Sequence, residues 1–217
     1  MKLYYAPGAC SLASHIVAIE EGLSLELEKV DLKTHRTETG KDFYSINPKG
    51  YVPAIESDSG AILTENVAIL PFLADLMPSA ELGAPDETME RVRLLEWLGY
   101  LAAEVHHAFS PFFHTADDAR KSEARETIRK RFAYLASRLD GHDYLMGKGF
   151  SVADAYLFVI LRWTPLAGID LKEFPVLDRY RARIAERPSV KAAMRDEGLT
   201  KERPSQQADK GAQARPS

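Results

Sequence analysis

The hydrophobic and polar positions of the first 80 residues change their period several times. Residues 2–5 form a short apolar run, and residues 25–31 carry aliphatic side chains separated by polar ones. Between these runs, residues 11–21 place apolar side chains at the spacing of one helical face, and Gly22 follows. The pattern predicts a strand, a helix and a second strand.

Two further apolar runs, residues 52–56 and 61–64, are joined by the polar segment Ser57-Asp58-Ser59-Gly60, which is typical of a hairpin. Residues 66–76 then return to helical spacing. The order βαβ followed by ββα predicts a thioredoxin-like domain over residues 1–80, with a mixed four-stranded sheet.

After a linker at residues 82–86, every periodic segment has helical spacing. Residues 87–199 are therefore predicted to form an all-α domain, and residues 200–217, which hold no large apolar side chain, a disordered tail. The predicted helices are residues 89–105, a helix through Ile128 and Leu139, residues 151–161 and residues 176–185, before Arg187-Pro188. The first of them aligns apolar side chains along one face: Met89, Val92, Leu95, Leu98, Leu101, Ala102 and Val105.

Composition narrows the function classes. The chain has 217 residues, 45% of them hydrophobic, and a net charge of −4, which gives no sign of a nucleic-acid-binding surface. No run approaches the ~20 apolar residues that a membrane helix needs. The first residues show no signal-peptide pattern, so we expect a cytoplasmic protein without membrane association. The single cysteine excludes intrachain disulfides and cysteine-rich metal sites.

That cysteine, Cys10, follows the turn Ala6-Pro7-Gly8-Ala9 and precedes the first predicted helix. The free N–H groups and positive dipole of a helix N-terminus favour thiolate over thiol. The position therefore predicts a reactive thiol with a pKa below the ordinary value of about 8.5. A buried structural cysteine is the alternative.

Two segments offer backbone or carboxylate groups to a ligand. Pro53 opens an apolar strand, so it belongs at a sheet edge or after a cis bond. A cis Val52–Pro53 bond would leave the Val52 backbone free to pair with a short peptide, whereas a trans bond would make an ordinary edge strand. At the start of the next helix, the sequence favours Asn66 as an N-cap, with an anion site and a Glu65–ammonium pair as the alternative.

Two other polar clusters have structural explanations. Ser151 and Asp154 have the spacing of a capping box at the head of the most apolar helix, which assigns Asp154 to folding. His106 and His107 point about 100° apart on a helix and cannot ligate one metal together. Glu104 could join His107, but no third ligand is near, so no metal site is predicted. A lone histidine is most often structural, although one at a cleft can hydrogen-bond a thiolate.

Four blocks of this sequence together resemble the bacterial beta-class glutathione S-transferases. They are the opening from Met1 to Ala13, the run from Asn47 to Ala54, the turn Leu63-Thr64-Glu65, and the block from Ser151 through Phe158 to Trp163. The resemblance covers roughly residues 1–199. It implies a thioredoxin-like domain, an all-helical domain, and a homodimer with glutathione in the cleft.

The resemblance also implies individual roles. Cys10 would lie at the glutathione sulfur, forming a mixed disulfide or a hydrogen bond to the thiolate, and His106 would be the second catalytic residue. The other expected glutathione contacts are the backbone at Val52 and Pro53, Glu65 and Asn66 at the γ-glutamyl group, Tyr51 beside the site, His35 at the glycyl carboxylate, His107, and Glu104 at the partner subunit's site. His35, Asn66 and His107 depart from the residues that the class often has, which bears on affinity more than on the site. Pro71 predicts a kink in the helix over residues 66–76.

The leading interpretation is an enzyme that conjugates or reduces small hydrophobic electrophiles with glutathione. A glutathione-dependent isomerase or dehalogenase is the second interpretation, and a non-catalytic ligand- or protein-binding member of the fold is the third. Residues 109–114 are expected at the electrophile pocket, where three phenylalanines indicate an apolar acceptor. Core packing explains at least one of these phenylalanines equally well.

Overall fold

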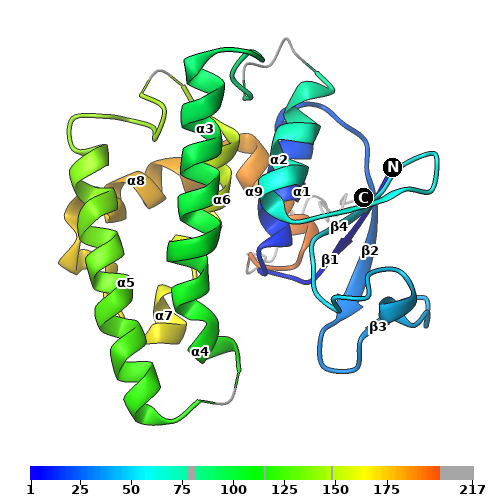
Figure 1. Ribbon diagram of the computed structural model, residues 1–217, viewed down its shortest axis with the longest axis horizontal. Helices are drawn as coiled ribbons and strands as arrows, with labels where there is room; N and C mark the ends of the chain where they lie inside the picture. The colour runs from blue at the N-terminus through cyan, green and yellow to red at the C-terminus, as the bar shows by residue number, and fades with distance from the viewer. Residues whose placement is uncertain (78–81, 115, 148, 201–217) are drawn as a thin grey trace, which may run out of the picture.

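The computed structural model describes residues 1–77, 82–114, 116–147 and 149–200. Its strands form one five-stranded sheet in the order β3-β2-β1-β4-β5. Helices α1 and α2 lie between this sheet and the helical part of the chain, in which α3 and α5 run side by side (Figure 1). The strands are β1 (Lys2–Tyr5), β2 (Glu26–Asp31), β3 (Arg36–Thr37), β4 (Ala54–Glu56) and β5 (Ile62–Thr64), and the two helices beside them are α1 (Ser11–Glu20) and α2 (Asn66–Asp75).

The central strand β1 fixes the register of the sheet. Leu3 is opposite Leu27 in the parallel pair with β2, and opposite Ile55 in the antiparallel pair with β4. Leu3 and Ile55 are buried, so the central pair is held by apolar packing on the helix-covered side as well as by its ladder. This arrangement agrees with the predicted thioredoxin-like order of elements.

The prediction of four strands was wrong by one. Strand β3 lies in the polar stretch after β2 and pairs Thr37 with Val30. Thr37 is the only buried residue of β3, so its sequence has no apolar period to reveal a strand. In α2, the helix continues past the buried Pro71 to Asp75, close to its predicted end.

The second region is helical throughout. Its α-helices are α3 (Met89–Tyr100), α4 (Ser110–Phe113), α5 (Asp118–Leu139), α6 (Val152–Leu161), α7 (Thr164–Ala167), α8 (Pro175–Ala185) and α9 (Pro188–Asp196). A π-helical turn, Leu101–His106, and a 3-10 turn, His107–Phe109, carry the chain from α3 into α4. The predicted end of a domain near residue 80 and the predicted tail fall on residues 78–81 and 201–217, which lie outside the described residues.

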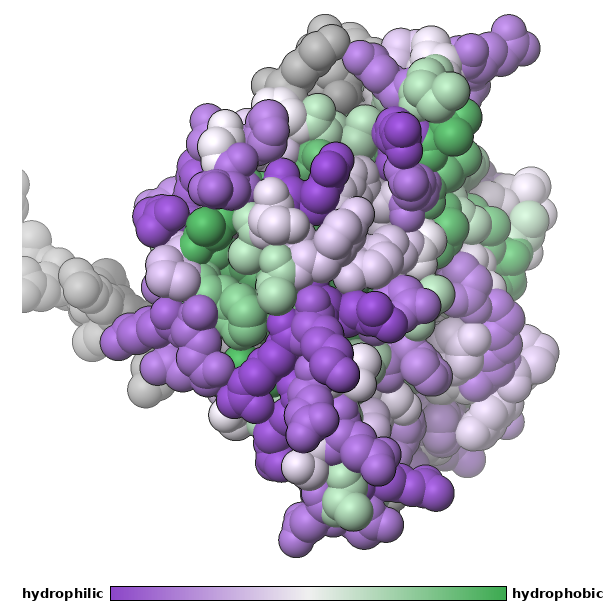
Figure 2. Space-filling model, turned by 60° about the vertical axis from the view of Figure 1, so that its left-hand side comes forward, coloured by the Kyte–Doolittle hydropathy of each residue, from purple (hydrophilic) through white to green (hydrophobic). Residues whose placement is uncertain are grey.

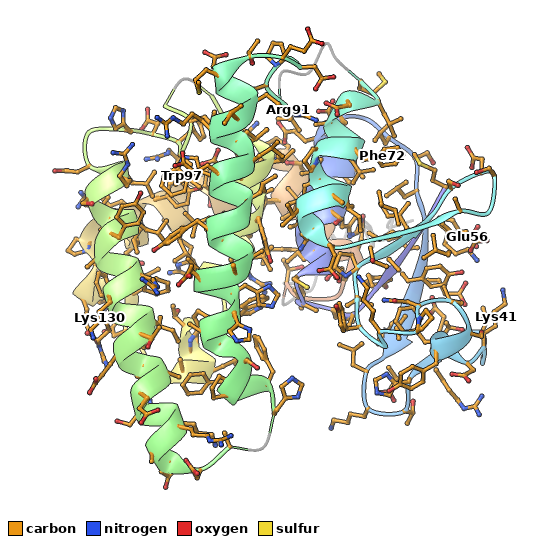
Figure 3. All side chains as sticks on the ribbon, viewed as in Figure 1. Lys41, Glu56, Phe72, Arg91, Trp97 and Lys130 are labelled. Carbon is orange, nitrogen blue, oxygen red and sulfur yellow. The ribbon has the colours of Figure 1, made fainter. Side chains whose placement is uncertain are left out.

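The predicted apolar face of α3 was partly wrong. Met89, Val92 and Leu95 are 68%, 56% and 42% exposed, while Leu94 and Trp97 face the core. Trp97 lies between α3 and α5, where its ring meets Tyr134 at 6.1 Å (Figure 3). Leu98, Leu101 and Val105 of the predicted face are fully buried, so the prediction is right for the second half of the segment and wrong for its first turns.

Helix α9 was not predicted, because Pro188 was interpreted only as the end of α8. Proline is also favoured in the first turn of a helix, where its missing N–H has no partner to lose. Pro188 is the first residue of α9, whose Val190 and Ala193 are buried. The helix packs against α1, so it takes part in supporting the segment that carries Cys10.

Helix α6 lies at the centre of the helical region, and all ten of its residues are buried. The predicted capping box at its head is present. Asp154 accepts hydrogen bonds from the Ser151 N–H at 2.9 Å, the Ser151 hydroxyl at 2.6 Å, the Leu145 N–H at 2.9 Å and the Tyr180 hydroxyl at 2.7 Å. The predicted structural role of Asp154 is thus supported by four donors to a buried carboxylate.

Candidate functional site

The Cys10 thiol lies where the turn after β1 meets the N-terminus of α1. Its Sγ donates to the Val52 carbonyl oxygen at 3.2 Å, across to the segment that precedes β4. The Val52–Pro53 peptide bond is cis, one of the two forms that the sequence left open. The Val52 N–H makes no hydrogen bond to any residue that the structure describes. Val52 therefore offers a backbone donor beside the thiol.

The predicted low pKa of Cys10 is contradicted. Burial raises the pKa of the Cys10 thiol to about 12, and the Glu65 carboxylate adds to the effect. The N–H groups of Cys10 and Ser11 at the helix start act in the opposite direction, but they do not outweigh desolvation. The hydrogen bond to Val52 also needs the thiol proton. The sequence indicated that Cys10 lies at a helix start but not that it is buried, and burial has the larger effect on its pKa.

Glu65 lies directly before α2, with a backbone φ of +74°. One oxygen of its carboxylate accepts from the Lys49 ammonium at 2.5 Å and from the Tyr51 hydroxyl at 3.0 Å. Desolvation opposes ionisation of Glu65, but these two hydrogen bonds outweigh it and lower its pKa. A non-glycine residue in this backbone region is strained, by about 1–3 kcal/mol, and such strain gathers at functional sites. Glu65 is therefore held as an anion that already binds an ammonium group.

Asn66 does not cap α2 through its side chain, which corrects the favoured interpretation from the sequence. Glu65 occupies the N-cap position, and its side chain makes no capping hydrogen bond. The Asn66 amide instead joins α2 to α1: its Nδ2 donates to the Cys10 carbonyl oxygen at 3.0 Å, and its Oδ1 accepts from Ser14 at 2.9 Å. Asn66 is buried and holds the backbone of Cys10 in place.

His106 ends the π-helical turn and approaches the same region from the helical domain. Its Nδ1 lies 2.7 Å from the Tyr156 hydroxyl, and its ring lies 4.8 Å from that of Trp163. Burial lowers the pKa of His106 to about 4, aided by the neighbouring His107 and opposed by Glu65. His106 is therefore a neutral imidazole at physiological pH.

In the turn before Cys10, the backbone of Gly8 is hydrogen-bonded to the helical domain. The Trp163 indole donates to the Gly8 carbonyl oxygen at 2.9 Å, and the Gly8 N–H donates to Glu197 at 2.9 Å. The other Glu197 oxygen lies 3.1 Å from Nδ1 of the buried His15. Gly8 has a φ of +73°, a conformation that suits glycine. Both polar backbone groups of Gly8 are thus bound by side chains far along the chain.

Three residues expected at the glutathione site have other surroundings in the structure. His35 Nδ1 donates to the Gly50 carbonyl oxygen, 3.0 Å away, which places His35 next to the loop of Tyr51. His107 is exposed. Glu104 is also exposed and pairs with Arg131 of α5. Within one chain, neither Glu104 nor His107 contacts the Cys10 thiol or Val52.

Sequence reasoning missed three residues at this site: Lys49, Tyr156 and Trp163. Lys49 lies in the segment that carries Val52, and no role was predicted for its side chain. In α6, Tyr156 is the only residue besides Asp154 with a polar side-chain group. Because a buried phenol needs a partner, its place in an otherwise apolar helix was a usable signal.

Two searches of the described residues gave negative results. Over residues 1–77, 82–114, 116–147 and 149–200, no group of three or more histidine, cysteine, aspartate or glutamate side chains is arranged to hold a metal ion. In the same part of the chain, no helix combines the length and the apolar character needed to cross a membrane.

Comparisons with known proteins define the class. The model of the glutathione S-transferase N-terminal domain matches residues 1–75, and that of the C-terminal domain matches residues 100–188. The chain belongs to the glutathione S-transferase family. It is similar to the glutathione S-transferase GstA of Escherichia coli O157:H7, with 42% identity over 92% of this chain and 100% of the relative.

Solved structures narrow the class. A sphingomonad glutathione S-transferase, complexed with glutathione, shares 46% identity with a TM-score of 0.89, and covers 92% of this chain with 100% of its own. The bacterial beta-class enzyme of Sphingomonas chungbukensis shares 47% identity with a TM-score of 0.90 over the same proportions. The resemblance to bacterial beta-class enzymes, the two-domain fold and the assignment as a glutathione transferase are confirmed.

Proposed function

We propose that this glutathione transferase uses Cys10 and His106 to add the glutathione sulfur to small hydrophobic electrophiles. The main support is the pairing of the Cys10 thiol with the Val52 carbonyl, 3.2 Å apart, beside a Val52 N–H that is free among the described residues. A cysteinyl residue that pairs with the Val52 backbone would place its own sulfur next to Cys10.

The charge of Glu65 supports the orientation of glutathione. The Lys49 ammonium lies 2.5 Å from Glu65, so the carboxylate can hold an ammonium group. Lys49 is exposed and can turn into solvent at little cost. The γ-glutamyl ammonium would take its position, with the sulfur directed to Cys10. His35, which bonds to the carbonyl of Gly50 next to Tyr51, is the proposed neighbour of the glycyl carboxylate.

A neutral Cys10 favours conjugation over chemistry that begins with a Cys10 thiolate. A thiol can donate a hydrogen bond to the glutathione sulfur and so stabilise its anionic form. A mixed disulfide, by contrast, requires Cys10 itself to ionise. No contact among the described residues favours the isomerase, the dehalogenase or the non-catalytic alternative over conjugation.

Aromatic rings next to His106 support an apolar, aromatic acceptor. The Phe113 ring lies 6.3 Å from His106 and 5.0 Å from Trp163, and 41% of Phe113 is exposed. Phe109 is fully buried, so it serves the core, as the packing interpretation allowed. Phe113 is the side chain placed to meet an electrophile.

We also propose the homodimer that the resemblance implies. Met89, Val92 and Leu95 share one exposed side of α3. Most of the surface in Figure 2 is hydrophilic, with hydrophobic residues gathered in separate patches. An exposed apolar stripe on a helix is typical of a protein interface. Glu104 follows α3 and would approach the site of the second subunit only in such a dimer.

A cytoplasmic location stays a prediction from the sequence.

Glutathione conjugation of a generic aryl halide tests the function. We expect turnover by the wild-type protein, and retention on immobilised glutathione. His106→Ala should lower kcat and kcat/KM together, by roughly 10²-fold, with little change in glutathione affinity. His107→Ala, on an exposed side of the helix, is the matched control and should be mild. Wild-type protein that binds glutathione without turnover of any electrophile in a panel would favour the non-catalytic alternative.

A further inference from the structure

We infer that Tyr156 is a positioning residue for His106: its hydroxyl holds the imidazole in the tautomer that carries the proton on Nε2. His106 then acts as a neutral hydrogen-bond donor rather than as a base. The inference rests on the proposed role of His106 in the transferase reaction.

The contact between the two side chains is short and buried. Tyr156 projects from the middle of α6 and is 2% exposed. Its hydroxyl oxygen lies 2.7 Å from His106 Nδ1, and the two rings are nearly perpendicular, at 86°. The distance is that of a hydrogen bond between a hydroxyl group and an imidazole nitrogen.

The surroundings of the Tyr156 hydroxyl determine which partner supplies the proton. Among the described residues, the hydroxyl has one hydrogen-bond partner, His106 Nδ1. If Nδ1 carried the proton, the buried hydroxyl would have no acceptor for its own. Tyr156 therefore donates to His106 Nδ1.

The ionisation of both rings agrees with this direction. Burial raises the pKa of Tyr156 well above its ordinary value, so the hydroxyl keeps its proton. Burial lowers the pKa of His106 to about 4, so the imidazole carries one proton. With Nδ1 as the acceptor, that proton must be on Nε2.

The remaining nitrogen is available for the reaction. His106 Nε2 has no hydrogen-bond partner among the described residues, and the ring packs against Trp163 and Phe113. A donor fixed in this way strengthens its hydrogen bond as negative charge grows on a sulfur atom, without any proton leaving the imidazole.

The test combines nitrogen NMR with kinetics of Tyr156→Phe. In wild-type protein at pH 7, long-range ¹⁵N–¹H spectra should show a protonated Nε2 and an unprotonated Nδ1 for His106. Tyr156→Phe should reduce kcat at least about tenfold with little change in the KM for glutathione, and its spectrum should show tautomer exchange. In a His106→Ala background, the same substitution should cause no further loss.

Tyr180→Phe is the matched control, because Tyr180 is also buried and its hydroxyl donates to Asp154 in the same domain. It should lower stability while the folded enzyme keeps its kcat. The inference is wrong if wild-type His106 is an imidazolium or carries its proton on Nδ1 at pH 7. It is equally wrong if Tyr156→Phe keeps wild-type kcat, or if its effect is fully additive with His106→Ala. Wild-type protein without any turnover would contradict the proposed function instead, and the spectra would still decide the tautomer.

Discussion

The N-terminus of α6 and the N-termini of α1 and α2 use their polar groups differently. At α6, Ser151 and Asp154 bond to each other and to the backbone, and the buried carboxylate accepts from four donors. At α1 and α2, the N-cap residues are Cys10 and Glu65, and neither side chain caps its helix. The start of α6 is therefore capped by side chains, whereas at the starts of α1 and α2 the thiol and the carboxylate bond to other partners.

Polar residues at helix starts look alike in the sequence. At α6 they stabilise the fold, whereas at α1 and α2 they are available for function. A side chain that caps a helix contributes about 1 kcal/mol to stability. Cys10 and Glu65 make no such capping hydrogen bond, and the negative charge of Glu65 adds to the rise in the Cys10 pKa. At α1 and α2, the polar side chain at the helix start is therefore available for a role other than capping.

The largest expected effect concerns the ionisation of Cys10. A thiol pKa of about 12 lies some three units above an ordinary thiol, so the thiolate fraction at pH 8 should be roughly a thousandfold smaller. Alkylation of the protein without added glutathione should be very slow at pH 8 and still accelerating at pH 10. An inflection at or below pH 8.5 would restore the expectation from the sequence.

The second prediction removes the carboxylate from the capping box of α6. Asp154→Ala should destabilise the fold by about 3 kcal/mol or more, because Ser151, Leu145 and Tyr180 lose a shared buried acceptor. Glutathione affinity of the folded fraction should stay near the wild-type value. Denaturant unfolding and calorimetric titration measure the two quantities, and a selective loss of affinity would place Asp154 at the site.

The third prediction concerns Glu65, where we expect a loss of ligand affinity rather than of stability. Glu65→Ala should weaken glutathione binding by about 1.5–3 kcal/mol, since a charge-assisted hydrogen bond to the ligand ammonium is lost. Its stability should change little, because Glu65 is half exposed and its pair with Lys49 is a surface pair. Lys49→Ala is the control and should leave affinity unchanged or higher. A drop in melting temperature with intact affinity would reverse the roles assigned to Glu65 and Asp154.

What could be predicted from the sequence depended on local signals. The helix after Cys10, the hairpin after Pro53 and the capping box at Asp154 were visible, because each rests on neighbouring residues. The exposed side of α3, the Asn66 bridge to Cys10 and the high thiol pKa were not, because each depends on which distant segment covers the residue. Tertiary burial, rather than the local pattern, decided these three.

The smallest expected effect lies at the other end of α1. Glu21 is 4% exposed, and neither carboxylate oxygen has a hydrogen-bond partner among the described residues. Burial raises the pKa of Glu21 to about 7, with a smaller contribution from Glu20. The folded state thus holds the proton more tightly than the unfolded state, and the stability from this group is complete below about pH 4.5 and lost as the pH rises through 7.

Glu21→Gln removes that pH-dependent loss. It should raise the free energy of unfolding at pH 8 and change it little at pH 4.5. Glu20→Gln is the matched control: Glu20 pairs with Arg187 and accepts from Ser189, so neutralising it should not stabilise the fold. Urea unfolding at the two pH values measures the difference. Equal effects of Glu21→Gln at both pH values would mean that Glu21 is ionised in the folded state with a partner.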